Sequence, residues 1–148
     1  MRNKKNRIAR FATILIIAIV LMLRLSFGFV IVHGDSMANT LSDGQVIVIR
    51  RNIGLINRGD IVVVLINNKE IVKRVCAVCG DKVELRDGKV FVNDIRILPY
   101  NYEGEDKNIV IKTGEVFLVG DNYYESYDSR SYGPVLSKNV IGIMIIIL

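Results

Sequence analysis

Basic residues crowd the first ten positions of the chain, and a long apolar run follows them at once. The basic residues are Arg2, Lys4, Lys5, Arg7 and Arg10, and the run over residues 8–23 is interrupted only by Arg10 and Thr13. Its uncharged part is shorter than the roughly 20 residues of a membrane span, but Arg24 can reach the interface and lengthen it. The pattern predicts a transmembrane helix with its basic arm on the cytoplasmic side.

Two other interpretations of this segment compete with an anchor. A cleaved secretory signal also has a basic start and a short apolar stretch, but it needs a small-x-small cleavage site. Arg24, Leu25, Ser26 and Phe27 follow instead. A buried core helix would be capped by an unusual cluster of cations. We therefore expect residues 1–26 to be a cytoplasmic arm and an uncleaved single-pass anchor in the cell membrane, with the rest of the chain extracytoplasmic.

After residue 27 the pattern changes from helical to β. Runs rich in β-branched residues occupy residues 27–32, 46–51, 61–66, 70–78 and 115–119. Turn signals at Asn67-Asn68 and Asp87-Gly88 predict two hairpins. The final run over residues 140–148 is too short to span a membrane as a helix and predicts a buried last strand.

These runs predict a mainly β fold in which one antiparallel domain over residues 27–148 follows the anchor. We expect a coiled or barrel-like sheet that avoids exposed edges, with a short insertion around residues 82–114. The most loop-like part of that insertion is the polar, acidic stretch of residues 98–108.

Charge and cysteine content exclude several classes of function. The net charge of +5 comes largely from the N-terminal arm, whereas nucleic-acid binding would place basic and aromatic residues together on the folded part. Cys76 and Cys79 form a single CxxC, and the chain has one histidine, too few ligands for a zinc site. They are either small apolar residues at a strand end or a strained disulfide.

Ser36 follows Gly34 and Asp35 in a turn, where a serine is usually no more than a turn residue. A serine nucleophile needs a base, and His33 lies only three residues before it on the same expected strand, a poor geometry for a triad. Lys73 lies within the apolar run IVKRV. An exposed lysine would be inert, but burial disfavours the ammonium form and makes a neutral amine available as a general base. Arg74 alternates to the opposite face.

A third polar stretch, GDNYYESYDSR over residues 120–130, follows an expected strand. On its own it can be a turn whose side chains satisfy their own backbone. Together with the other two stretches it offers the polar side chains that hold a site in place, namely Asp121, Asn122, Ser126, Asp128 and Arg130.

Taken in order, the motifs HGDSMANTL, RGDIVVV, VKRV with CGD, and GDN with DSR resemble those of the type I signal peptidases, membrane-bound serine proteases that remove signal peptides from exported proteins. The resemblance runs from the anchor to the last strand. The motif VKRV carries a lysine and not a histidine, and in this it resembles the bacterial members of the family.

The resemblance implies a Ser-Lys dyad, with Ser36 as the nucleophile and Lys73 as the general base. It implies that Ser126 hydrogen-bonds the lysine amine and that Asp128 and Arg130 form an ion pair behind it. Gly34 stands where some members carry an oxyanion-hole serine, so backbone amides, chiefly that of Ser36, are expected to hold the oxyanion. Asn39 stands where the family usually has a proline, and CAVC over residues 76–79 stands where it usually has Gly and Pro beside the lysine.

The expected substrates are signal peptides of preproteins emerging from the secretion machinery, cut after Ala-x-Ala-like sequences without metal or cofactor. The expected partners are these peptides and the lipid bilayer. Shallow apolar pockets that accept small side chains are expected from Val30, Val32, Met37, Leu41 and Val72. Two other interpretations stay open: an anchored β-module that binds extended peptides by strand addition, and a Ser-Lys hydrolase with a dedicated substrate, such as a self-cleaving repressor or a specialised processing peptidase.

Overall fold

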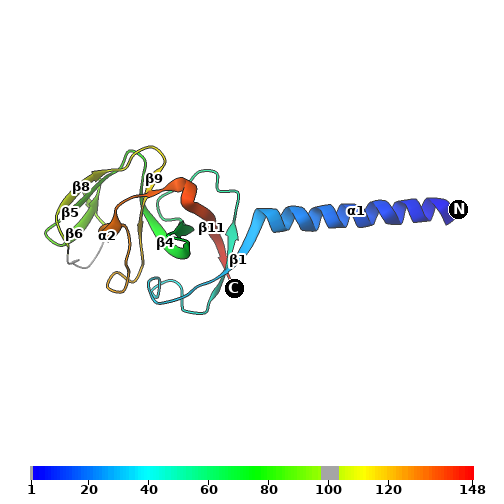
Figure 1. Ribbon diagram of the computed structural model, residues 1–148, viewed down its shortest axis with the longest axis horizontal. Coiled ribbons are helices and arrows are strands. Elements are labelled where there is room, and N and C mark those ends of the chain that lie inside the picture. The colour runs from blue at the N-terminus through cyan, green and yellow to red at the C-terminus, as the bar shows by residue number, and fades with distance from the viewer. Residues whose placement is uncertain (1, 98–103) are drawn as a thin grey trace.

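The computed structural model describes residues 2–97 and 104–148. Helix α1 (Arg2–Ser26) projects from a β-rich domain as a separate rod, and its axis points away from the strands (Figure 1). Among the described residues, no helix combines the length and the apolar content that crossing a membrane requires. The predicted transmembrane helix is therefore not confirmed.

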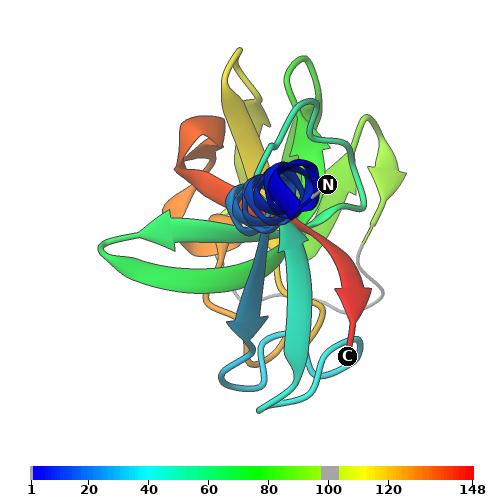
Figure 2. The same ribbon diagram turned by 90° about the vertical axis from the view of Figure 1, so that its right-hand side faces the viewer.

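Seven strands form one antiparallel sheet in the spatial order β1-β2-β11-β3-β4-β9-β10. Their bounds are β1 (Phe27–Ile31), β2 (Val46–Arg50), β3 (Ile61–Ile66), β4 (Lys69–Val78), β9 (Glu115–Val119), β10 (Val135–Leu136) and β11 (Val140–Ile147). Figure 2, viewed along α1, shows β1, β2 and β11 side by side beneath the helix. The prediction of a mainly β, antiparallel domain is confirmed.

The sheet does not close into a barrel, which corrects the expectation of a fold without edges. Strands β1 and β10 lie at its two ends and do not pair with each other. A second free edge arises inside the sheet along β4. Strand β3 pairs with β4 from Lys69 onward, whereas β9, on the other side of β4, pairs with it only from Arg74 onward. Residues 69–73 thus keep one side of their backbone unpaired within the described part of the sheet.

Both predicted hairpins are confirmed. Asn67 and Asn68 join β3 to β4 with positive φ angles of 49° and 61°, and Asp87 and Gly88 join β5 to β6 with φ angles of 50° and 67°. Asparagine, aspartate and glycine tolerate this left-handed backbone better than other residues, and two-residue hairpin turns require it.

The expected insertion forms a separate antiparallel sheet of four strands, in the order β7-β6-β5-β8. These strands are β5 (Lys82–Arg86), β6 (Lys89–Val92), β7 (Ile95–Arg96) and β8 (Lys107–Val110). Of the stretch predicted to be a surface loop, residues 98–103 lie outside the described residues. Two short helices, α2 (Ser129–Tyr132) and η1 (Ser137–Asn139), flank β10 and were not predicted.

The last strand corrects the sequence prediction in part. Val140 and Ile143 are buried, but the last three residues of β11, Ile145, Ile146 and Ile147, are exposed, as is Leu148 after it. A register shift between Met144 and Ile146 turns this end of the strand away from the core where it runs along β2.

Three buried clusters stabilise the domain, and one of them supports the predicted site. That cluster joins the segment after β1 to β2 and β3 through Val32, Met37, Leu41, Ile47, Ile49, Ile61 and Val63. Met37, which follows Ser36 directly, is 1% exposed and therefore fixes the backbone of the serine turn against the sheet.

Candidate active site

The structure brings Ser36 and Lys73 together. Ser36 lies in the turn after β1, and Lys73 lies in β4 at the end of its unpaired edge. The Lys73 ammonium nitrogen Nζ is 2.6 Å from the Ser36 hydroxyl oxygen Oγ. This is the distance that a nucleophile and its general base require.

Burial alters the chemistry of Lys73, which is 4% exposed. The loss of solvation lowers its pKa, and the Arg130 cation lowers it further, whereas the carboxylates of Asp128 and Asp121 act in the opposite direction. The net effect is a pKa below the ordinary value for lysine, so a larger fraction of the amine is neutral near physiological pH. A neutral amine can accept the proton of the serine hydroxyl.

The serine turn is fixed from both sides. Gly34 has a φ angle of 81°, and its N–H donates to the Asp43 carboxylate at 2.8 Å. On the other side the Asn122 N–H donates to the Ser36 carbonyl at 3.0 Å, and the Asn122 amide donates to the Asp35 carbonyl at 2.9 Å. The Ser36 N–H donates to no acceptor in the described part of the chain and is therefore available to a ligand.

Gly120 is required where β9 meets this turn. A Cβ atom at this position would overlap Ser126 Oγ and lie 2.5 Å from the Ser36 carbonyl oxygen. Its φ angle is not in the left-handed region, so space and not backbone conformation demands glycine here. The close approach lets residues 120–122 support the backbone of Ser36.

The predicted ion pair of Asp128 and Arg130 is confirmed, with 2.8 Å between Arg130 Nε and Asp128 Oδ1 and both side chains nearly inaccessible. Arg130 also donates to the carbonyls of Tyr123 and Ser126, and Asp128 accepts from the Gly120 N–H at 3.0 Å. Asp128 is in addition the N-cap of α2, where it accepts from Arg130 N–H. The pair therefore ties the loop to β9.

Ser126 differs from the expectation that its hydroxyl bonds the Lys73 amine. It donates to Asp128 Oδ2 at 2.7 Å, and no hydrogen bond joins it to Lys73 among the described residues. The buried Asp128 carboxylate is the stronger acceptor, because it is ionised and paired with Arg130.

Asp121 connects the serine turn to β4. Its carboxylate accepts two hydrogen bonds from Arg74, at 2.8 Å and 2.6 Å, and one from the Thr40 hydroxyl, while Asn39 donates to its carbonyl at 2.8 Å. Burial opposes the ionisation of Asp121, but the bonds from Arg74 and Thr40 prevail and keep its pKa below the usual value. Sequence reasoning did not identify Asn39 or Thr40 as supports, because their partner Asp121 is distant in sequence. It also missed Asp43, whose partner Gly34 is nine residues away.

A cavity of about 420 Å³, which we call the Ser36 cavity, opens beside the hydroxyl between β1 and β4. Of the predicted pocket residues, it is lined by Val30, Val32, Met37 and Val72. Leu41 is not among its walls, since it is fully buried in the cluster behind them. The prediction missed Phe29, Ile31, Glu70 and Ile71, which also line the cavity.

The histidine and the cysteines do not contribute a second nucleophile–base pair. His33 lines the Ser36 cavity, yet no hydrogen bond joins it to Ser36 in the described part of the chain. Cys76 and Cys79 are both free thiols, so the disulfide that the sequence left open does not form in this structure. Burial raises the pKa of Cys76 to about 12, which makes it a poor nucleophile.

The chain matches known proteins over most of its length. The sequence model of the family described as "Signal peptidase, peptidase S26" matches residues 5–148. Signal peptidase I of Bacillus licheniformis is 32% identical, with 95% of this chain and 88% of that protein aligned. Thylakoidal processing peptidase 1 of Arabidopsis thaliana is 42% identical over 51% of this chain, which spans 24% of that longer protein.

The fold is also similar to that of a solved structure. The crystal structure of a signal peptidase I from Enterococcus faecalis aligns with a TM-score of 0.52 and 23% sequence identity. The alignment covers 64% of this chain and 100% of that one.

Proposed function

Because the chain belongs to the signal peptidase family, peptidase S26, and is a serine peptidase, we propose that it cleaves signal peptides from exported preproteins through a Ser36-Lys73 dyad. The observation that carries this proposal is the 2.6 Å contact between the Lys73 amine and the Ser36 hydroxyl.

The proposed reaction begins when neutral Lys73 accepts the proton of the Ser36 hydroxyl. Ser36 Oγ then attacks the scissile carbonyl carbon and forms a tetrahedral intermediate. As this intermediate collapses, the C–N bond breaks and the protonated Lys73 gives its proton to the departing amine. A water molecule, deprotonated by the again neutral lysine, then attacks the acyl-serine ester. As the ester C–O bond breaks, Lys73 returns that proton to Ser36 Oγ and the acid product leaves.

The negative oxygen of the intermediate needs donors that are in place before the reaction. The unused N–H of Ser36 is our candidate, because the buried Met37 and the bond from Asn122 to the Ser36 carbonyl fix its direction. Preorganised donors of this kind are worth about 10²–10³ in rate.

The substrate would bind as an extended strand. The outer edge of β1 and the unpaired edge of β4 over residues 69–73 both border the Ser36 cavity, and each can pair with a peptide backbone. Side chains of the peptide would then enter a cavity walled by Val30, Val32 and Met37. Val32 and Met37 are buried and close the floor of the cavity, and we expect it to accept small residues, as in Ala-x-Ala.

Peptide cleavage tests this function directly. We expect the intact chain in detergent to cut a peptide after Ala-x-Ala, and to cut it at least about tenfold less efficiently when Phe replaces the last Ala. Ser36→Ala should have no measurable activity on either peptide. Equal cutting of the Ala and Phe peptides would contradict the proposed pocket, and an inactive wild-type protein would contradict the function.

We further propose that α1 anchors the domain to the cell membrane, with the basic arm in the cytoplasm and the β domain on the extracytoplasmic side. The apolar side chains of α1 are exposed, as Ile14 at 63% and Met22 at 65% illustrate. Phe27 and Phe29 of β1, which follow the helix directly, are exposed as well, and so is the end of β11, which lies beyond β2 in the same sheet (Figure 2). An apolar surface of this size requires a partner, and a bilayer fits it.

A further inference from the structure

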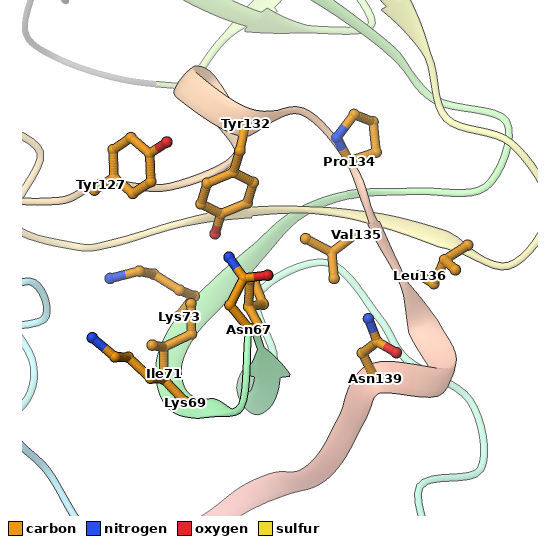
Figure 3. A pocket seen from close by; sticks show the side chains of 11 residues that line it. Asn67, Lys69, Ile71, Lys73, Tyr127, Tyr132, Pro134, Val135, Leu136 and Asn139 are labelled. Atoms are coloured by element: carbon orange, nitrogen blue, oxygen red, sulfur yellow. The ribbon is translucent and has the colours of Figure 1, made fainter.

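A second and larger cavity lies on the other side of Lys73. We call it the Tyr132 cavity. It measures about 780 Å³, within the range of ligand-binding pockets, and runs between β4 and the segment that contains α2 and β10. Figure 3 shows Lys73 and Ile71 on one wall and Tyr127, Tyr132, Val135 and Leu136 on the other.

Ile71 and Lys73 border both cavities, whereas Ser36 borders only the smaller one. The two cavities therefore meet at the proposed dyad. A peptide whose scissile bond lies beside the Ser36-Lys73 contact has one half on each side of this point.

The chemistry decides which half lies on which side. The acyl half of the substrate stays bonded to Ser36 Oγ, so it belongs in the Ser36 cavity. The other half departs as an amine that receives its proton from Lys73, so its first residues lie on the lysine side. We propose, on the basis of the proposed function, that the Tyr132 cavity binds the leaving half of the peptide and favours a large apolar or aromatic side chain there.

The walls of the cavity fit such an occupant. Val135, Leu136 and the tyrosine rings provide apolar contact, and the Tyr127 and Tyr132 rings meet edge to face with centroids 5.4 Å apart. The Tyr132 hydroxyl itself is buried, so the side chain contributes mainly apolar surface to the cavity.

Peptides that share one Ala-x-Ala acyl half and differ only after the scissile bond test the assignment. We expect wild-type kcat/KM to be about tenfold higher when the first or second leaving residue is Phe than when both are Ala. Leu136→Ala and Tyr127→Ala, which alter exposed walls, should reduce this ratio toward one. Leu65→Ala, a similarly exposed residue outside both cavities, should keep the ratio.

Three results would overturn the assignment. The first is a kcat/KM that does not change with the residues after the scissile bond, in an enzyme that still prefers Ala over Phe before that bond. This result would refute the inference and leave the proposed function intact. Altered selectivity for the acyl half in Leu136→Ala and Tyr127→Ala would place the wrong half in this cavity. Failure of the wild-type protein to cut any of the peptides would refute the proposed function, and the inference with it.

Discussion

The buried amine of Lys73 serves the proposed chemistry at the expense of folding. A lysine that is 4% exposed and has a lowered pKa binds its proton less tightly in the folded chain than in the unfolded chain. Between the folded and unfolded pKa values the unfolded chain therefore holds more protons, and stability rises with pH through that window. Below the folded pKa the full cost of the buried charge remains.

Replacing Lys73 by Met removes this cost and should stabilise the fold. We expect Lys73→Met to have a higher Tm than the wild type, and the difference in Tm to be larger at about pH 6 than at about pH 10. The variant should be inactive. Thermal denaturation followed by circular dichroism at both pH values measures the difference. A Tm that falls equally at both pH values would show that the amine stabilises the fold.

A substitution at Gly120 tests how precisely the backbone of Ser36 must be held. In Gly120→Ala the new Cβ has to displace Ser126 or the Ser36 carbonyl, so we expect kcat/KM to fall by about 10² or more while the chain still folds. Gly142→Ala is a matched control, because its Cβ would lie 2.5 Å from Ile49 in the core, away from the site. It should lower Tm and preserve the activity of the folded protein. Equal loss of activity in both variants would remove any special role for Gly120.

Among the elements, the two hairpins and most strand positions could be predicted because their signals are local. Asn67-Asn68 and Asp87-Gly88 specify a backbone conformation by themselves. The exposed end of β11 could not be predicted, since its run of isoleucines does not show which strand will pack beside it. The open sheet was missed for the same reason: closure depends on β1 and β10, which are distant in sequence.

The same distinction holds for the site. Ser36, Lys73 and the Asp128-Arg130 pair lie in short motifs that the sequence displays. The links that hold them together join distant residues, as Asn39 to Asp121 and Ser36 to Asn122 do. The Tyr132 cavity also escaped prediction, because its walls come from β4 and from the segment around β10, which the motifs do not connect.

Asp81 links the small sheet to the main sheet. Its carboxylate accepts from Arg58, from the Val78 N–H at 2.9 Å and from the Asn93 amide at 3.1 Å. Asp81→Ala leaves these donors without their acceptor, and we expect the free energy of unfolding to fall by about 1–3 kcal/mol. Urea denaturation measures it, with the exposed Glu125→Ala as the control. A change no larger than that of the control would show that Asp81 does not join the two sheets.

The proposed anchor would place the basic arm and the β domain on opposite sides of the membrane. Helix α1 carries basic residues at its start and leads directly into β1, so a membrane-bound α1 would place the β domain on one side and the arm on the other. Protease added outside spheroplasts should digest the β domain and spare a tag placed before Arg2. Digestion of the domain only after lysis would reverse the topology.

The pH dependence of cleavage shows whether Lys73 acts as the general base. We expect kcat/KM for an Ala-x-Ala peptide to be low in acid and to rise with pH through the lowered pKa of Lys73. Lys73→Arg, which keeps the cation but cannot lose its proton, should fold and lose at least about 10³-fold in kcat/KM at every pH, whereas His33→Ala should retain the wild-type profile. A folded Lys73→Arg protein with substantial turnover, or a profile that disappears in His33→Ala, would contradict the Ser-Lys mechanism.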